Sequence, residues 1–164
     1  MERLARRGGA ILFGTAGVVF VLDRISKAWA HRMFADSPFD LIPGVVTLRY
    51  TTNSGGAFSL GQRAPWFFAT ATVIVAGLIV ATAFRPRSTI AALSLGLILG
   101  GALGNLADRI THGPGFSGRV VDFIDLHVWP VFNLADSAIV IGAVMLAVSS
   151  MGAGKGGAPE PDDP

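Results

Sequence analysis

The sequence predicts an integral membrane protein that is mainly α-helical, with four transmembrane helices and a small β element outside the membrane. Of the 164 residues, 51% are hydrophobic and only 15% are charged, well below the roughly 25% charged residues of an average soluble domain. The charged residues are also unevenly placed, so that long apolar runs lie between them. At this length one domain is expected, and we predict that it covers residues 1–151 as a single membrane-embedded unit.

The first apolar segment begins at Ala10, after an arginine-bearing start. The run to Leu22 is shorter than the roughly 20 residues needed to cross a bilayer core, but it becomes long enough if the helix continues to Ala30. Arg24 and Lys27 would then extend to lipid head groups at the far interface. The alternative is a cleaved signal peptide, which the three charges before its small-residue cleavage site make awkward. The four predicted spans are residues 10–30, 65–84, 89–107 and 131–151.

Residues 37–62 contain turn signals and a β-branched stretch, which together predict a small sheet outside the membrane. We expect a strand over Val45–Thr51, paired with Ala57–Leu60. An open sheet cannot lie in lipid, where its edges would leave backbone groups unpaired. The polar segment between the last two spans also lies outside the membrane core, and Val120–Val128 suits a short amphipathic piece on the interface. Residues 152–164 are rich in glycine and proline and predict a disordered tail.

Four spans place both termini on the same side of the membrane. Basic residues near the first span and in the turn at residues 85–88 favour a cytoplasmic N-terminus, although the opposite side carries as many. With this topology the outer ends of the helices collect several polar residues at one level. The residues at the outer level are Asp23, Asn53, Asn105, Asp108, Asp122, Asn133 and Asp136.

The net charge of +2 reflects membrane topology and does not indicate nucleic-acid binding.

Two of these aspartates, Asp122 and Asp136, predict an aspartyl dyad. A carboxylate in or near hydrocarbon is costly, so it is usually paired or functional. Two carboxyl groups that share one proton can activate water and protonate an amide carbonyl without a metal ion. The sequence has no cysteine, its serines lack a histidine–aspartate partnership, and His112 and His127 have no zinc-ligand spacing. We therefore expect no cofactor and no metal, and we expect the neighbouring Asp125 to lie at the surface.

The remaining polar residues have a structural interpretation beside the functional one. Asp23, Asn105 and Asp108 could form a clasp between helices, because a polar face on an apolar helix must find partners. Arg109 could pair with Asp108 or Asp23. On the third span, glycines 100 and 104 have the spacing that lets membrane helices pack closely.

Five segments in order resemble the bacterial lipoprotein signal peptidases, the signal peptidase II family. One short motif would be a weak signal, but five in the family's order cover most of the chain. The segments are Asp23–Lys27 (DRISK), Asn53–Phe58 (NSGGAF), Gly100–Arg109 (GGALGNLADR), Val120–Phe123 (VVDF) and Phe132–Ser137 (FNLADS).

The resemblance implies an aspartic endopeptidase that cleaves prolipoproteins on the N-terminal side of a diacylglyceryl-modified cysteine. It implies an extracytoplasmic β-cradle, a short interfacial periplasmic helix, and a site at the outer face of the bacterial inner membrane with both termini cytoplasmic. The implied partners are the prolipoproteins and membrane lipid, with no nucleic acid, and a monomer is expected. Asp122 and Asp136 match the catalytic dyad. The positions that match substrate-binding or dyad-supporting residues are Asp23, Asn53, Gly56, Asn105, Asp108, Arg109, Asn133 and Ala135.

Two other functions remain open on the sequence alone. A small proton- or ion-coupled carrier would also use membrane aspartates, but it would need polar groups near the bilayer midplane. A non-enzymatic assembly factor would tolerate replacement of both aspartates.

Overall fold

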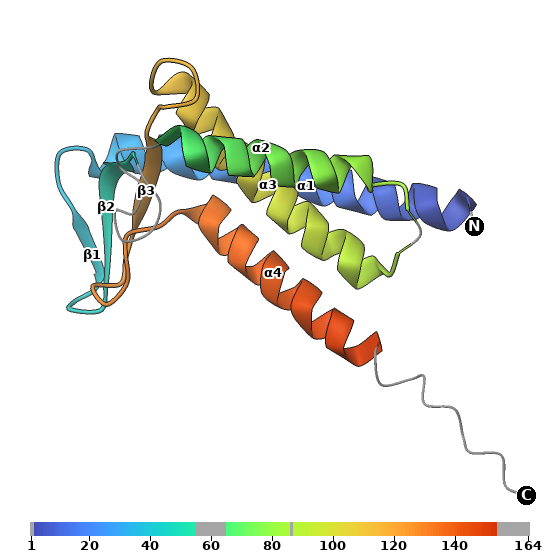
Figure 1. Cartoon of the computed structure of the whole chain (residues 1–164). Coiled ribbons are helices and arrows are strands. Elements are labelled where there is room, and N and C mark those ends of the chain that lie inside the picture. Colours follow the sequence, from blue (N-terminus) through green and yellow to red (C-terminus); the bar gives the residue numbers. More distant parts are fainter. Residues whose placement is uncertain (1, 55–64, 86, 154–164) are drawn as a thin grey trace, which may run out of the picture.

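The computed structural model describes residues 2–54, 65–85 and 87–153, and within them it contains helices gathered at one side of a small sheet (Figure 1). The predicted strand at Ala57–Leu60 and the predicted site residue Gly56 lie outside these residues. The helices are α1 (Glu2–Phe34), α2 (Pro65–Ala81), α3 (Thr89–Thr111) and α4 (Leu134–Ala153), and the strands are β1 (Phe39–Ile42), β2 (Val46–Asn53) and β3 (Val120–Asp125).

Three of the helices, α1, α3 and α4, are long and apolar enough to cross a membrane, and α2 is a shorter apolar helix of 17 residues. At about 1.5 Å per residue, the 33 residues of α1 extend well beyond a bilayer core. The helix continues without interruption through Lys27 and Ala30, both of which are buried. This continuity favours a membrane helix over a cleaved signal peptide. Helix α4 extends to Ala153, two residues beyond its predicted end.

Helix α3 lies at the centre of the bundle and packs against both α1 and α4. The glycine spacing explains this packing, as the sequence predicts. A Cβ atom at Gly100 would lie 2.6 Å from Ala16 O of α1, and one at Gly101 would lie 2.4 Å from Ala135 O of α4. The backbones therefore approach more closely than any side chain would allow. Larger apolar side chains, including Leu12 and Leu99, fill the space between the helices next to these contacts.

The sheet is antiparallel, with strand order β1-β2-β3. Figure 1 shows it at the end of the bundle away from both the start of α1 and the end of α4. A small apolar cluster joins it to the end of α1, where Ala30 and Phe34 contact Phe123 of β3. The sheet thus joins residues that are far apart in the sequence, because β2 follows the first helix and β3 precedes the last.

The short amphipathic piece predicted over Val120–Val128 is a strand over its first six residues, which form β3. Val120, Val121 and Phe123 are all buried, so the strand is covered on both faces. A strand covered in this way shows no alternation of apolar and polar residues, and its short apolar run resembles a buried piece of helix. The pairing with β2, which the sequence did not indicate, decides the conformation.

Candidate functional site

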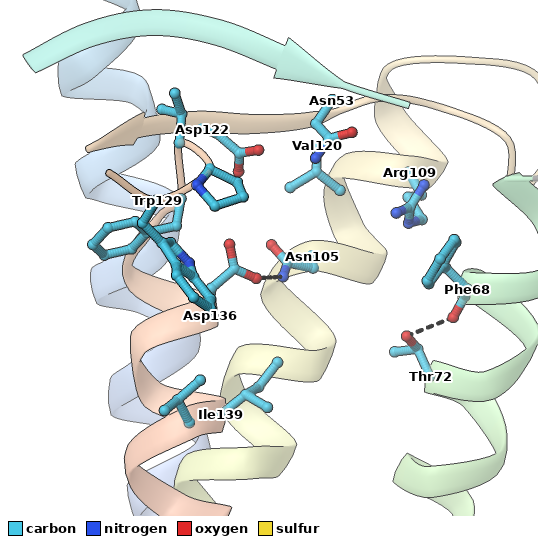
Figure 2. A pocket seen from close by; sticks show the side chains of 14 residues that line it. Asn53, Phe68, Thr72, Asn105, Arg109, Val120, Asp122, Trp129, Asp136 and Ile139 are labelled. Carbon is cyan, nitrogen blue, oxygen red and sulfur yellow. Dashed lines mark hydrogen bonds between the residues drawn. The ribbon is translucent and has the colours of Figure 1, made fainter. Parts of the chain in front are cut away.

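Asp122 and Asp136 line the same cavity, which has a volume of about 310 Å³. Figure 2 shows Asp122 entering it from β3 and Asp136 from the first turn of α4, with Arg109 and Phe68 on its far side. Asp122 is buried and Asp136 is partly buried. The prediction that these two aspartates lie at one level next to each other therefore agrees with the fold. Asn53, Asn105 and Arg109 line the same cavity.

The pairing of β3 places Asp122 in the cavity. Thr51 of β2 lies opposite Asp122, and Asn53 lies opposite Val120. The side chain of Asn53 forms a hydrogen bond with the Asp122 carboxyl group. After β3 the chain turns back, and Phe132 exchanges backbone hydrogen bonds with Ile124 at 2.9 and 3.0 Å. This turn brings Asn133 and the start of α4 next to β3.

Asn133 precedes the first residue of α4 and caps it. Its Oδ1 accepts a hydrogen bond from the Asp136 backbone N–H at 2.9 Å, and Asp136 Oδ2 accepts one from the Asn133 N–H at 3.3 Å. This reciprocal arrangement is that of a capping box. It holds the Asp136 carboxylate at a helix N-terminus, where the backbone dipoles favour negative charge.

Two asparagine amides connect the aspartates. Asn133 Nδ2 donates to Asp122 Oδ1 at 2.7 Å, and Asn105 Nδ2 donates to Asp136 Oδ1 at 2.8 Å. The amides also contact each other, because Asn133 Nδ2 lies 3.2 Å from Asn105 Oδ1. Each carboxyl group therefore receives an amide N–H from a residue on a neighbouring element. Asn133 is completely buried, so these bonds replace the water that its amide loses.

Next to the Asn105 amide lies a group of buried ion pairs. Lys27 Nζ is 2.8 Å from Asp23 Oδ2, in a geometry that makes an ion pair and not an aligned hydrogen bond, and 2.9 Å from Asp108 Oδ2. Asp108 Oδ1 also pairs with the partly exposed Arg24. The expectation that Lys27 extends to the lipid head groups was wrong: only 3% of it is exposed. Two buried carboxylates nearby offset the cost of removing its ammonium from water.

Asp23 and Asp108 each hold a backbone N–H next to one of the two aspartates. Asp108 Oδ2 accepts a hydrogen bond from the Val121 N–H, and Asp23 Oδ1 accepts one from the Ala135 N–H, both at 3.1 Å. Val121 directly precedes Asp122, and Ala135 directly precedes Asp136. The same contacts can both join the helices and support the two aspartates. The two roles that the sequence left as alternatives are therefore compatible.

Arg109 forms part of the cavity wall. Its Nη1 lies 3.3 Å from the carbonyl oxygen of Gly118 and 3.5 Å from that of Ser54, and its guanidinium lies over the Phe68 ring at 6.0 Å from the centroid. A guanidinium remains charged even when buried. It therefore places a fixed positive charge on the side of the cavity opposite the carboxyl groups.

The environment of Asp122 favours its protonated form. Burial raises the pKa of Asp122 from 3.8 to about 7, and the adjacent Asp136 carboxylate contributes to the rise. Hydrogen bonds from Asn133 and Asn53 and the charge of Lys27 oppose it. Burial and a like charge are the two effects that most often raise a carboxyl pKa. A proton is therefore available on this side chain near neutral pH.

The structure corrects one further prediction and adds two residues. Asp125 was expected at the surface, but it is buried and pairs with Arg49 at 2.7 Å. Lys27 belongs to the site and was missed, although its position four residues after Asp23 on a helix could have indicated the pair. Trp129 lines the cavity together with the aspartates and was missed because no motif includes it.

A second cavity, of about 340 Å³, opens beside Asp136 and is mainly apolar. Trp129 lines both cavities, so the two are adjacent. Among residues 2–54, 65–85 and 87–153, no group of three or more histidine or acidic side chains is arranged to hold a metal ion. The other residues of the second cavity are Leu126, Phe132, Ser137, Val140 and Ile141.

Comparison with known proteins gives one consistent result. The family described as signal peptidase (SPase) II matches residues 15–152. The lipoprotein signal peptidase of Syntrophomonas wolfei is 46% identical over 138 residues, covering 83% of this chain and 89% of that protein. That of Rhodococcus jostii is 43% identical over 143 residues, covering 86% and 72%. A solved structure described as a bacterial membrane enzyme has the same fold, with a TM-score of 0.77 at 24% identity, covering 93% of this chain and 94% of that one.

Proposed function

Since the chain belongs to the signal peptidase II family, we propose that Asp122 and Asp136 are the catalytic dyad of this lipoprotein signal peptidase. The protein is a membrane aspartic endopeptidase that removes signal peptides from prolipoproteins. The observation that carries the proposed dyad is the cavity into which both carboxyl groups extend, each held by an asparagine amide.

The two carboxyl groups have different roles in this proposal. Asp136 lies at a helix N-terminus and accepts N–H donors on both oxygens, so it is the ionised base that takes a proton from water. Asp122, with its raised pKa, holds the shared proton and donates it to the scissile carbonyl oxygen. The water oxygen bonds to the carbonyl carbon and gives a tetrahedral intermediate. Its collapse breaks the C–N bond as the leaving nitrogen takes a proton from the dyad.

The wall of the cavity suggests how the peptide is held. Asn53 and Arg109 both line it, and they can donate hydrogen bonds to the backbone carbonyls of an extended signal peptide. The apolar cavity beside Asp136 suits the acyl chains of a diacylglyceryl-cysteine. Binding energy from these chains, remote from the scissile bond, would hold the peptide in the reactive geometry.

We further propose that both termini are cytoplasmic and that the site opens at the outer face of the inner membrane, with a monomer as the working unit. The sheet lies at the end of the bundle away from the start of α1 and the end of α4 (Figure 1). Its strand β3 carries Asp122, and the first turn of α4 carries Asp136, which supports placing both termini on the side of the membrane opposite the site. The same position speaks against the ion-coupled carrier, since a transport path would need polar groups deep among the helices.

The test uses the purified protein in lipid nanodiscs with a diacylglyceryl-modified prolipoprotein, and locates the cut by mass spectrometry. We expect cleavage directly before the modified cysteine, and loss of at least about 10³-fold in rate for Asp122→Asn and for Asp136→Asn. Asp125→Asn is the matched control, since Asp125 is buried on the same strand but faces Arg49. Cleavage at the normal rate by either dyad variant would exclude the proposed roles.

A further inference from the structure

Lys27 occupies the centre of the polar network, although it touches neither carboxyl group of the dyad in the contacts described above. Its ammonium has three close partners. It forms ion pairs with Asp23 Oδ2 at 2.8 Å and Asp108 Oδ2 at 2.9 Å, and it donates a hydrogen bond to Asn105 Oδ1 at 2.9 Å. Each of the three partners in turn forms a hydrogen bond with Asp136 or with a residue directly before one of the two aspartates.

Two of these partners fix the backbone that carries the dyad. Asp23 accepts the Ala135 N–H and Asp108 accepts the Val121 N–H, so the residue before each dyad aspartate is tied to a carboxylate that Lys27 holds. The ammonium bridges the two carboxylates, which come from α1 and α3. Through them it links the start of α4 to β3, and this link sets the separation of the two elements that bear the dyad.

The third partner fixes the orientation of the amides. Because Lys27 can only donate, it must meet the carbonyl oxygen of Asn105 and not its NH₂ group. The Asn105 NH₂ group then faces the other way, where it donates to Asp136 Oδ1 at 2.8 Å. The same oxygen accepts from Asn133 Nδ2 at 3.2 Å, which directs the Asn133 amide toward Asp122. One ammonium thus determines which end of both amides faces the carboxyl groups.

We propose that Lys27 is a positioning residue for the reaction, which sets the spacing of Asp122 and Asp136 and the orientation of the amides that hold them. This inference rests on the proposed dyad. It assigns to Lys27 a role in the rate of the chemical step and not in substrate binding, because Lys27 does not line the cavity. The charged and titratable groups around it are Asp23, Arg24, Asp108, Arg109, His112, Asp122 and Asp136.

The test compares Lys27→Met with Arg24→Met in nanodiscs, on the same diacylglyceryl-modified substrate. Methionine keeps much of the length of lysine without the donors. We expect Lys27→Met to lower kcat about 100-fold, as a small misplacement of reacting groups does, with KM changed less than about threefold. Arg24 pairs with the same Asp108, but 36% of its side chain is exposed, so Arg24→Met should change kcat less than about fivefold.

The pH profile distinguishes the loss of the positioning charge of Lys27 from a loss of folded protein. The charge of Lys27 lowers the pKa of Asp122, so without the cation the limb of the kcat/KM profile that reports Asp122 should move to higher pH, and Arg24→Met should leave it in place. If Lys27→Met does not fold, combining it with Asp23→Asn removes one of the two buried carboxylates that would otherwise lose their partner, and the same kcat loss is expected. An unchanged kcat and profile in a folded Lys27 variant would overturn the inference, and so would an equal loss in Arg24→Met. If the dyad variants keep activity, the proposed dyad fails, whatever Lys27→Met does.

Discussion

Asn133 and Asp136 each cap the other, with Asn133 Oδ1 accepting the Asp136 N–H at 2.9 Å and Asp136 Oδ2 accepting the Asn133 N–H at 3.3 Å. The contacts that begin α4 are therefore also the contacts that hold one carboxyl group of the proposed dyad. The other end of the Asn133 side chain donates to Asp122 at 2.7 Å. One asparagine thus couples the start of a helix to the geometry of both aspartates.

Substitutions of Asn133 should separate these two roles. Asn133→Ala removes the cap and the amide, so we expect a loss of about 1–2 kcal/mol in the free energy of unfolding together with a loss of activity. Asn133→Ser keeps a capping oxygen but cannot donate to Asp122 and Val121 O together, as Asn133 does. It should keep most of the stability and lose activity at least tenfold. Thermal unfolding and kcat of both variants measure the difference, and equal losses of stability would contradict the capping role.

Activity should depend on the proton that Asp122 holds. Because burial and Asp136 raise its pKa to about 7, the proposed acid is protonated below that pH and loses its proton above it. We expect kcat/KM to fall above about pH 7, approaching tenfold per pH unit. A pH series in nanodiscs, with substrate binding followed separately, measures this fall. A rate that stays constant up to pH 9 would show that Asp122 does not donate the proton.

The same raised pKa predicts how stability depends on pH. Between 3.8 and about 7 the folded protein holds a proton on Asp122 that the unfolded chain releases, so this group makes the protein less stable as pH rises through that window. Asp122→Asn removes the ionisation. The unfolding temperature of the variant relative to the unaltered protein should therefore rise from pH 4 to pH 8, by an amount worth a few kcal/mol at most. If the difference in unfolding temperature between Asp122→Asn and the unaltered protein stays constant with pH, the prediction is wrong.

The helices and the level of the site follow from local features of the sequence, which is why both were predictable. Long apolar runs with few charges fix the spans, and the glycine spacing indicates that the third span packs closely against its neighbours. The local motifs around Asp122 and Asp136 also indicate these two residues. The rest of the fold and of the site depends on contacts between residues that are far apart in the sequence. The strand over Val120–Asp125 was not predicted, because nothing within this segment indicates the pairing with β2, about seventy residues earlier.

The two misplaced charges have the same explanation. Lys27 and Asp125 looked like surface residues because charged side chains are rarely buried without partners. Lys27 has one partner nearby, Asp23, but its second partner Asp108, and Arg49, the partner of Asp125, lie about eighty positions away in the sequence. Only the fold brings them together. Buried ion pairs between distant segments are therefore the part of this site that composition and spacing could not reveal.

Gly104 should tolerate no side chain, because it lies against the ion pairs. A Cβ atom there would be 2.4 Å from Asp23 Oδ2, and moving that carboxylate would break its contact with Lys27. We expect Gly104→Ala to lower the unfolding temperature and the activity together, with a stability loss of about 1–3 kcal/mol. Gly14 of α1 is the control, since nothing lies within 4 Å of a Cβ atom there. If Gly104→Ala behaves like Gly14→Ala, the close packing of α3 on Asp23 is not needed.

Trp129 should contribute to substrate affinity more than to the chemical step. It lines the cavity that holds the two aspartates and also the apolar cavity beside Asp136, so its ring borders both the peptide and the acyl chains in the proposed complex. More than half of the side chain is exposed, and the loss of its ring should therefore cost little stability. Removing apolar contact that is equal in the ground state and the transition state raises KM and leaves kcat unchanged.

We expect Trp129→Ala to raise KM roughly tenfold or more. Trp66→Ala, at a similarly exposed position on α2, is the control and should leave KM unchanged. Steady-state kinetics should be measured with a diacylated and a non-lipidated peptide. The increase in KM should be larger for the diacylated peptide. An equal increase for both peptides would place the acyl chains elsewhere.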